Sequence, residues 1–137
     1  MEAFFGKKYI MTYEENLAEY LSFTGIKKIS QGLMFRMKAV FCLTRTSDGV
    51  YTLSLSTEFK HLEYVFLPGE EFDDIDLDNR KGKSVITIDG NVMTIIQRSA
   101  NGKISKTISH YYHDKIIMIT TALGFKKTVK RHLELVQ

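Results

Sequence analysis

Residues 69–97 read GEEFDDIDLDNRKGKSVITIDGNVMTIIQ, and this stretch combines turn signals and strand patterns more densely than any other window of the chain. Residues 84–88 are rich in β-branched side chains, which suit a pleated sheet surface. Asp-Gly-Asn at 89–91 tolerates positive φ, and residues 92–97 then resume the strand pattern. An Asp-Gly pair between two such runs is a strong short-range signal, so the stretch predicts a β-hairpin.

Strand patterns separated by turns continue on both sides of this hairpin. Residues 50–59 alternate the apolar Tyr51, Leu53 and Leu55 with Thr and Ser, which is typical of a strand with one buried face. The other strands are predicted at residues 4–12, 40–46, 64–67, 103–112, 115–121 and 126–136. A count of about ten short strands with regularly spaced turns favours a sandwich or a barrel.

Two short helices interrupt this pattern near the start of the chain. Residues 17–24 have helical spacing, with Asn16 as a possible N-cap and Gly25 as the stop. Residues 26–38 are predicted to form a second helix, although residues 35–43 could already be strand. Its apolar face is predicted to consist of Ile29, Leu33, Met34 and Met37, with Lys27, Lys28, Gln31, Arg36 and Lys38 around the rest. Because two short helices cannot cover a sheet face, we expect them to cap an open end of the barrel.

The composition indicates one soluble domain, residues 1–137, with 44% apolar and 26% charged residues and no membrane-spanning run. The net charge of +3 is spread over many segments, which disfavours nucleic acid as a partner and leaves a weak attraction to anionic membranes open. The single Cys42 excludes an internal disulfide and fits a cytoplasmic location.

Chemical motifs are missing from the sequence. It contains neither a Gly-rich phosphate loop nor a G-x-S-x-G elbow, so we predict that the protein is not an enzyme. Its histidines lack metal-ligand spacing, and the acidic run at 73–78 lacks the alternation of a calcium loop, so we predict neither a metal nor a cofactor. Polar residues at both parities of several strands indicate either a solvated cavity or simply a solvent-facing surface.

Several segments together resemble the intracellular lipid-binding proteins, the family of fatty-acid-binding and cellular retinoid-binding proteins. They are Phe4/Phe5-Gly6, residues 15–21 followed by Gly25, residues 57–60 with Glu63, and the order and spacing within residues 69–97. The resemblance covers nearly the whole chain. It implies an all-β, lipocalin-like β-clam: a ten-stranded antiparallel β-barrel of two orthogonal sheets around a water-containing cavity, capped by a helix-turn-helix.

In that family an arginine and a tyrosine two residues apart on the last strand hold the ligand carboxylate, with a second arginine two strands earlier. Arg131 matches the first arginine, whereas Leu133 replaces the tyrosine and Ser109 replaces the second arginine. Lys130 is the alternative cation if the register slips. The head-group site that the resemblance implies therefore consists of Arg131 with Ser109, Tyr111 and Gln97 as compensating donors.

The same resemblance implies ligand entry between the second helix and the turns near Phe59 and residues 77–80. Portal and tail contacts are expected from Leu17, Leu21, Leu33, Phe59, Leu77, Met118 and Leu133, although residues at such spacing can equally be plain core.

The function implied is that of an intracellular carrier, a monomer that binds long-chain fatty acid noncovalently for transport or buffering. Two alternatives stay open: a carrier of a retinoid or other neutral hydrophobic ligand, and a membrane-associating structural protein. The second draws on the basic residues Lys27, Lys28, Arg36 and Lys38, which either meet anionic membranes or merely solvate the helix.

Overall fold

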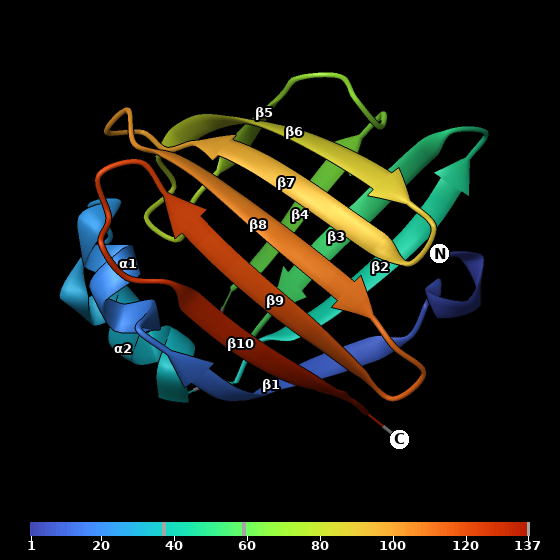
Figure 1. Ribbon diagram of the computed structural model, residues 1–137, viewed down its shortest axis with the longest axis horizontal. Helices are drawn as coiled ribbons and strands as arrows, with labels where there is room; N and C mark the ends of the chain where they lie inside the picture. Colours follow the sequence, from blue (N-terminus) through green and yellow to red (C-terminus); the bar gives the residue numbers. More distant parts are fainter. Residues whose placement is uncertain (37, 59, 137) are drawn as a thin grey trace.

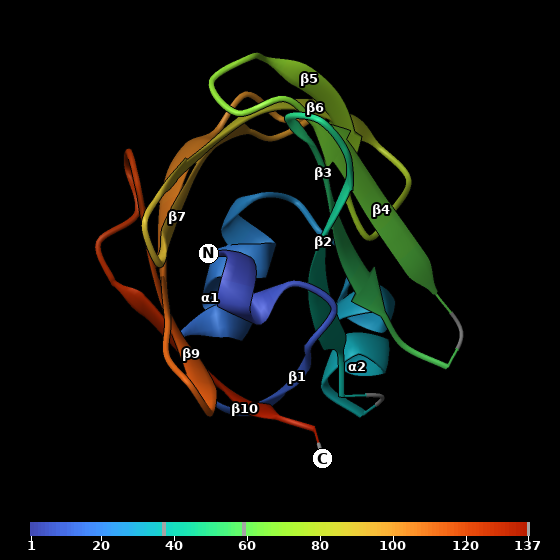
Figure 2. The same ribbon diagram turned by 90° about the vertical axis from the view of Figure 1, so that its right-hand side faces the viewer.

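The computed structural model describes residues 1–36, 38–58 and 60–136, whose strands form one antiparallel sheet curled into a barrel (Figures 1 and 2). The ten strands are β1 Lys8–Glu15, β2 Val40–Ser47, β3 Val50–Ser56, β4 His61–Phe66, β5 Phe72–Ile75, β6 Lys81–Asp89, β7 Val92–Arg98, β8 Ile104–Tyr111, β9 Lys115–Ala122 and β10 Val129–Leu135. Figure 1 shows β6 to β10 crossing β2 to β4 at a steep angle. The predicted all-β barrel is confirmed.

The strand order is β4-β3-β2-β1-β10-β9-β8-β7-β6-β5, so β4 and β5 are the two edges of the sheet although they are consecutive in the chain. No backbone ladder joins β4 to β5 within the described residues. Aromatic side chains occupy the gap instead: the ring of Phe72 lies 6.3 Å from that of Tyr64 and 5.9 Å from that of Phe66. The barrel is thus closed at this seam by side-chain packing.

Helices α1 (Leu17–Phe23) and α2 (Lys28–Arg36) lie together at one end of the barrel, as predicted (Figure 1). Asn16 precedes α1 with φ 63°, but its side chain does not cap the helix; instead Glu14 Oε2 accepts from the backbone N–H of Leu17 at 3.0 Å. Gly25, with φ +88°, ends α1, and the following N–H of Ile26 donates to Leu21 O at 2.9 Å. This left-handed cap turns the chain directly into α2.

The predicted apolar face of α2 is wrong in part. Ile29 and Leu33 are 71% and 41% exposed, whereas Met34 is buried, and Met37 lies outside the described residues. Gln31, which we expect on the polar face, is also buried, because its Nε2 donates to Ile26 O at 2.9 Å and to Ser22 Oγ at 3.1 Å. The helix therefore faces the barrel through Met34 and Gln31 and presents Ile29 and Leu33 to solvent.

Several strand boundaries also differ from the prediction. β4 begins at His61 instead of residue 64, β6 at Lys81 instead of residue 84, and β10 runs over Val129–Leu135 instead of 126–136. The first strand begins at Lys8 instead of residue 4, because Glu2–Phe4 forms a 3₁₀ turn, η1. Residues 72–75 form a strand, β5, which was not predicted because acidic residues are typical of a loop.

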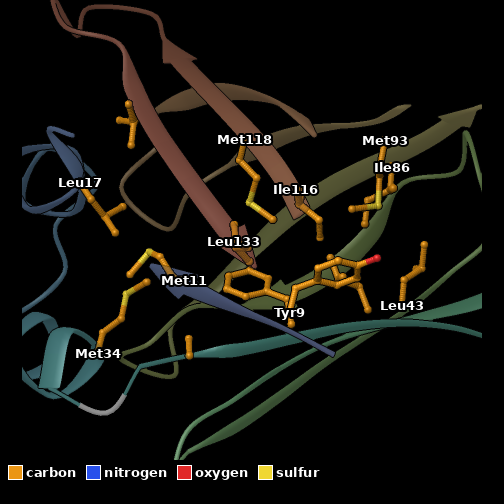
Figure 3. Close-up of a cluster of buried hydrophobic side chains, with 14 of the residues drawn as sticks. Tyr9, Met11, Leu17, Met34, Leu43, Ile86, Met93, Ile116, Met118 and Leu133 are labelled. Atoms are coloured by element: carbon orange, nitrogen blue, oxygen red, sulfur yellow. The ribbon is translucent and has the colours of Figure 1, made fainter. Parts of the chain in front are cut away.

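The buried core extends from Leu17 and Met34 at the helices to Tyr9 and Leu43 toward the opposite end of the barrel. In Figure 3 the side chains of Met118, Ile116, Met93 and Ile86 descend from one wall toward those of Tyr9 and Leu43 on the other. Phe4 and Tyr9 flank the buried Tyr111, with ring centroids 5.5 and 5.9 Å away. This end is therefore closed by aromatic rings and apolar side chains.

None of the helices in the described residues is both long enough and apolar enough to span a membrane.

Candidate functional site

The barrel encloses a hollow that several of these core side chains line. It consists of two lobes of about 150 Å³ each and a third of about 110 Å³ under α2, and Met34 and Leu55 line all three. A single water molecule needs roughly 10–15 Å³ of such space. The structure therefore contains a cavity, which is one of the two alternatives that the polar strand residues left open.

Arg131 is the only arginine or lysine among the described residues that line both larger lobes. The residue keeps part of its surface accessible, whereas its Nε is fully buried. Its Nη2 donates to Thr120 Oγ1 at 3.2 Å, whereas its buried Nε has no hydrogen-bond partner. Burial lowers the pKa of this guanidinium, and the more distant Tyr20 and Glu14 oppose that shift. An arginine nevertheless stays protonated, so the hollow contains a fixed positive charge.

Hydroxyl groups surround this charge. Thr120 shares a hydrogen bond of 2.7 Å with Thr107, which lines both lobes. Ser109 is fully buried, lines one of the lobes, and its Oγ lacks a partner. Arg131 pairs with Met118 on β9, and Met118 pairs with Ser109 on β8, so Arg131 and Ser109 flank one methionine. Two polar atoms, Nε and Oγ, are thus buried without a hydrogen-bond partner on either side of an apolar side chain.

A carboxylate faces the same two lobes from the opposite wall. Asp74 on β5 is 4% exposed, and its Oδ2 accepts from the Ser84 hydroxyl and from Gln97 Nε2, the latter at 3.1 Å. Burial raises the pKa of Asp74, while these two hydrogen bonds oppose the rise. Burial likewise raises the pKa of Tyr64, with Asp74 adding to the shift, and the Tyr64 hydroxyl donates to Ile75 O at 2.9 Å.

The mouth of the hollow lies where α2 meets the loop between β5 and β6. Leu33 and Leu77 line the third lobe together with Lys60 and Ser30. Asp78 ties the loop to the helix, because it accepts from the backbone N–H of Lys27 at 2.7 Å and from the Ser30 hydroxyl. Burial raises the pKa of Asp78, but these hydrogen bonds outweigh that effect and leave it below the usual value.

Most of the residues selected from the sequence lie at the hollow. Its lining includes Arg131, Ser109, Gln97, Leu17, Leu21, Leu33, Leu77 and Met118. Tyr111 and Leu133 do not occur in the described lining: Tyr111 packs between Phe4 and Tyr9, and Leu133 is fully buried in the core. Lys130, the alternative to Arg131, is likewise outside that lining, and Phe59 lies outside the described residues.

Sequence reasoning missed the polar residues that accompany Arg131. They are Thr107, Thr120, Asp74, Ser84 and Tyr64. Alternation was the available signal, since residues two apart on a strand face the same side and Thr107 shares its parity with Ser109.

Comparisons with known proteins agree with this architecture. No protein-family model matches the chain. A liver fatty acid-binding protein of Lethenteron camtschaticum is 33% identical over 109 residues, which cover 80% of this chain and 93% of that protein. A solved structure of a fatty acid-binding protein from brain tissue of Drosophila melanogaster is 28% identical and covers 96% of this chain and 98% of its own, with a TM-score of 0.84.

A second solved structure, a Schistosoma mansoni fatty acid binding protein in complex with arachidonic acid, has a TM-score of 0.88 over all of this chain and 98% of its own at 22% identity, so it supports the fold alone. The barrel, its helical cap and its enclosed hollow are those of an intracellular lipid-binding protein. The chain belongs to the fatty-acid-binding protein family, and the resemblance found in its sequence is confirmed.

Proposed function

We propose that the protein is a carrier that binds long-chain fatty acid noncovalently inside its barrel, for transport or buffering in the cytosol. The similar proteins from Lethenteron camtschaticum and Drosophila melanogaster are fatty-acid-binding proteins by name. The single observation that carries the proposal is the guanidinium of Arg131, which lines both larger lobes and whose buried Nε has no hydrogen-bond partner.

A buried positive charge requires a compensating anion, because removing it from water costs several kcal/mol. None of the ion pairs in the described part of the chain includes Arg131. A ligand carboxylate bound beside the guanidinium supplies this anion, and the Ser109 hydroxyl, on the other side of Met118, is a second donor for it. Arg131 and Ser109 are therefore the proposed head-group residues.

The walls of the hollow suit a hydrocarbon tail. Met118, Met93 and Ile86 line one lobe, and Leu17 and Leu21 line the other. Each methylene group transferred from water to such walls contributes about 0.8 kcal/mol. Lipids with longer apolar chains are thus expected to bind more tightly until the hollow is full.

The test compares oleate with methyl oleate, which differ in the charge of the head group. Affinities are measured by displacement of a fluorescent fatty acid from the delipidated protein. The wild type is expected to bind oleate more tightly, and Arg131→Gln is expected to bind the two ligands equally. Arg45→Gln is the matched control, because Arg45 lies on the exterior with its side chain 41% exposed. Equal binding of both ligands by the wild type would instead favour the carrier of neutral lipids.

Transfer to membranes is a second part of the proposal. The exposed Ile29 and Leu33 of α2 lie beside Lys27 and Lys28, which are also exposed, so one helix offers apolar and basic side chains together. This pattern favours transient contact of a monomeric carrier with anionic lipid. Sedimentation with anionic vesicles should fall at high salt, and Ile29→Ser with Leu33→Ser should weaken it further. Binding that ignores both changes would argue against contact through α2.

A further inference from the structure

The Asp74 carboxylate is held in one orientation by residues of two neighbouring strands. Ser84 on β6 and Gln97 on β7 pair with each other in the sheet, and both side chains donate to Oδ2 of Asp74. The carboxylate is nearly inaccessible from outside the barrel, yet it lines both larger lobes. It is therefore a preorganised acceptor directed at the hollow.

The second oxygen of this carboxylate remains available. Within the described residues, Oδ1 receives no hydrogen bond, although an ionised carboxylate accepts up to about four. Gly82 lies opposite it on β6, and a Cβ there would lie only 2.8 Å from Oδ1. The same Cβ would lie 2.6 Å from Arg98 O, so only glycine allows β6 to pack this closely beside the carboxylate.

Asp74 does not neutralise Arg131, since the two residues form no ion pair although they line the same lobes. Their strands lie on opposite sides of the barrel, β5 at the top and β10 at the bottom of Figure 2. Between them the lining is mostly apolar and includes Leu55 and Phe72. A ligand that satisfies both groups carries an anion at one end and a hydrogen-bond donor farther along its apolar chain.

Building on the proposed fatty-acid carriage, we propose that Asp74, Ser84 and Gln97 form a second polar subsite that binds a hydroxyl group on the ligand chain. The cavity would then prefer fatty acids hydroxylated in mid-chain to unsubstituted ones. A plain chain covers the carboxylate without offering it a donor, and a site built to bond a hydroxyl discriminates against the analogue that lacks it. A hydroxyl next to the head group lies at the Arg131 end and gains nothing.

The first test needs only the wild-type protein. Dissociation constants are measured for stearate and for a series of hydroxystearates in which the hydroxyl moves along the chain. We expect a few adjacent mid-chain positions to bind about tenfold more tightly than stearate, as one added hydrogen bond to a charged group implies. The isomer hydroxylated at carbon 2 should match stearate or bind less tightly. Weaker binding of every isomer would overturn the subsite.

Variants then assign the preference to the residue. Asp74→Leu removes the acceptor at similar volume and is expected to reduce the ratio of hydroxystearate to stearate affinity to one or less. Asp73→Leu is the matched control, because Asp73 is the next residue on β5 and its side chain is 73% exposed. A ratio that survives Asp74→Leu would refute the assignment. If that variant does not fold, Asp74→Asn keeps the size and should at least halve the ratio; an unchanged ratio there would refute it equally.

The two proposals fail in different ways. Arg131→Gln should weaken binding of stearate and of every hydroxystearate by the same factor, leaving their ratio intact. If it leaves all affinities unchanged, the head-group assignment is wrong while the ratio still reports on Asp74.

Discussion

Replacing Arg131 with leucine is expected to stabilise the delipidated protein and to weaken its binding of fatty acid. Both effects come from one group, the guanidinium whose Nε is buried without a partner. A buried donor without a partner costs about 1–3 kcal/mol. The substitution also removes the bond from Nη2 to Thr120, but Thr120 keeps its 2.7 Å hydrogen bond to Thr107.

The free energy of unfolding of the Arg131→Leu variant should therefore rise by about 1–3 kcal/mol without ligand. Its affinity for oleate should fall, because a hydrogen bond to a charged partner contributes about 1.5–3 kcal/mol, equivalent to roughly a 10- to 150-fold change. Saturating oleate should then stabilise the wild type more than the variant.

Urea denaturation of delipidated samples measures the first effect, and displacement of a fluorescent fatty acid measures the second. Thr120→Val serves as a control, because it removes a partner of the guanidinium and leaves the charge in place. A variant that is less stable and binds oleate as tightly as the wild type would refute the assignment of Arg131 as a binding residue that destabilises the empty barrel.

Three further predictions concern the walls and the mouth of the hollow. Asp78→Ala removes the acceptor of the 2.7 Å hydrogen bond from Lys27 N at the start of α2, so stopped-flow measurements should show fatty-acid dissociation roughly fivefold faster. An unchanged dissociation rate would mean that α2 does not limit the exit of the ligand. Gly82→Ala places a Cβ 2.6 Å from Arg98 O and should lower the free energy of unfolding by about 1–3 kcal/mol, and an unchanged urea midpoint would contradict this crowding. Burial raises the pKa of Asp74 above its value of 3.8 in an unfolded chain, so the folded state binds the proton more tightly. The stability of the wild type relative to Asp74→Asn should therefore decrease as pH rises from about 4. A pH-independent difference would show that Asp74 does not titrate in this way.

Local signals explain which parts of the fold are predictable from the sequence. The hairpin between β6 and β7 depends on Gly90, with φ 61°, and on β-branched neighbours, all within a few residues. Strand β5 was hidden because Asp73 and Asp74 are typical of a loop. Asp74 is stable in a buried position only because Ser84 and Gln97 donate to it, and those donors are brought by pairing with other strands.

The candidate site was predictable in part for the same reason. Arg131 was found through its place in a family pattern, but the missing hydrogen-bond partner of its buried Nε becomes visible only in three dimensions. The orientation of α2 was not predictable from helical spacing, because Ile29 is apolar and yet faces away from the barrel. An exposed apolar residue of this kind is expected where the surface contacts a membrane or a ligand instead of the core.

The strand order has a consequence for how the chain acquires this structure. Every pair of adjacent strands in the sheet is also adjacent in sequence, except β1 and β10, which join Tyr9 to Leu135. A nascent chain that still lacks β10 therefore holds two meanders, β1 to β4 and β5 to β9, with no backbone hydrogen-bond ladder between them. Because late pairing of distant segments is slow, the apolar inner surfaces stay open to other molecules until β10 leaves the ribosome. Pairing of β1 with β10 is therefore the step that closes the apolar interior of the barrel.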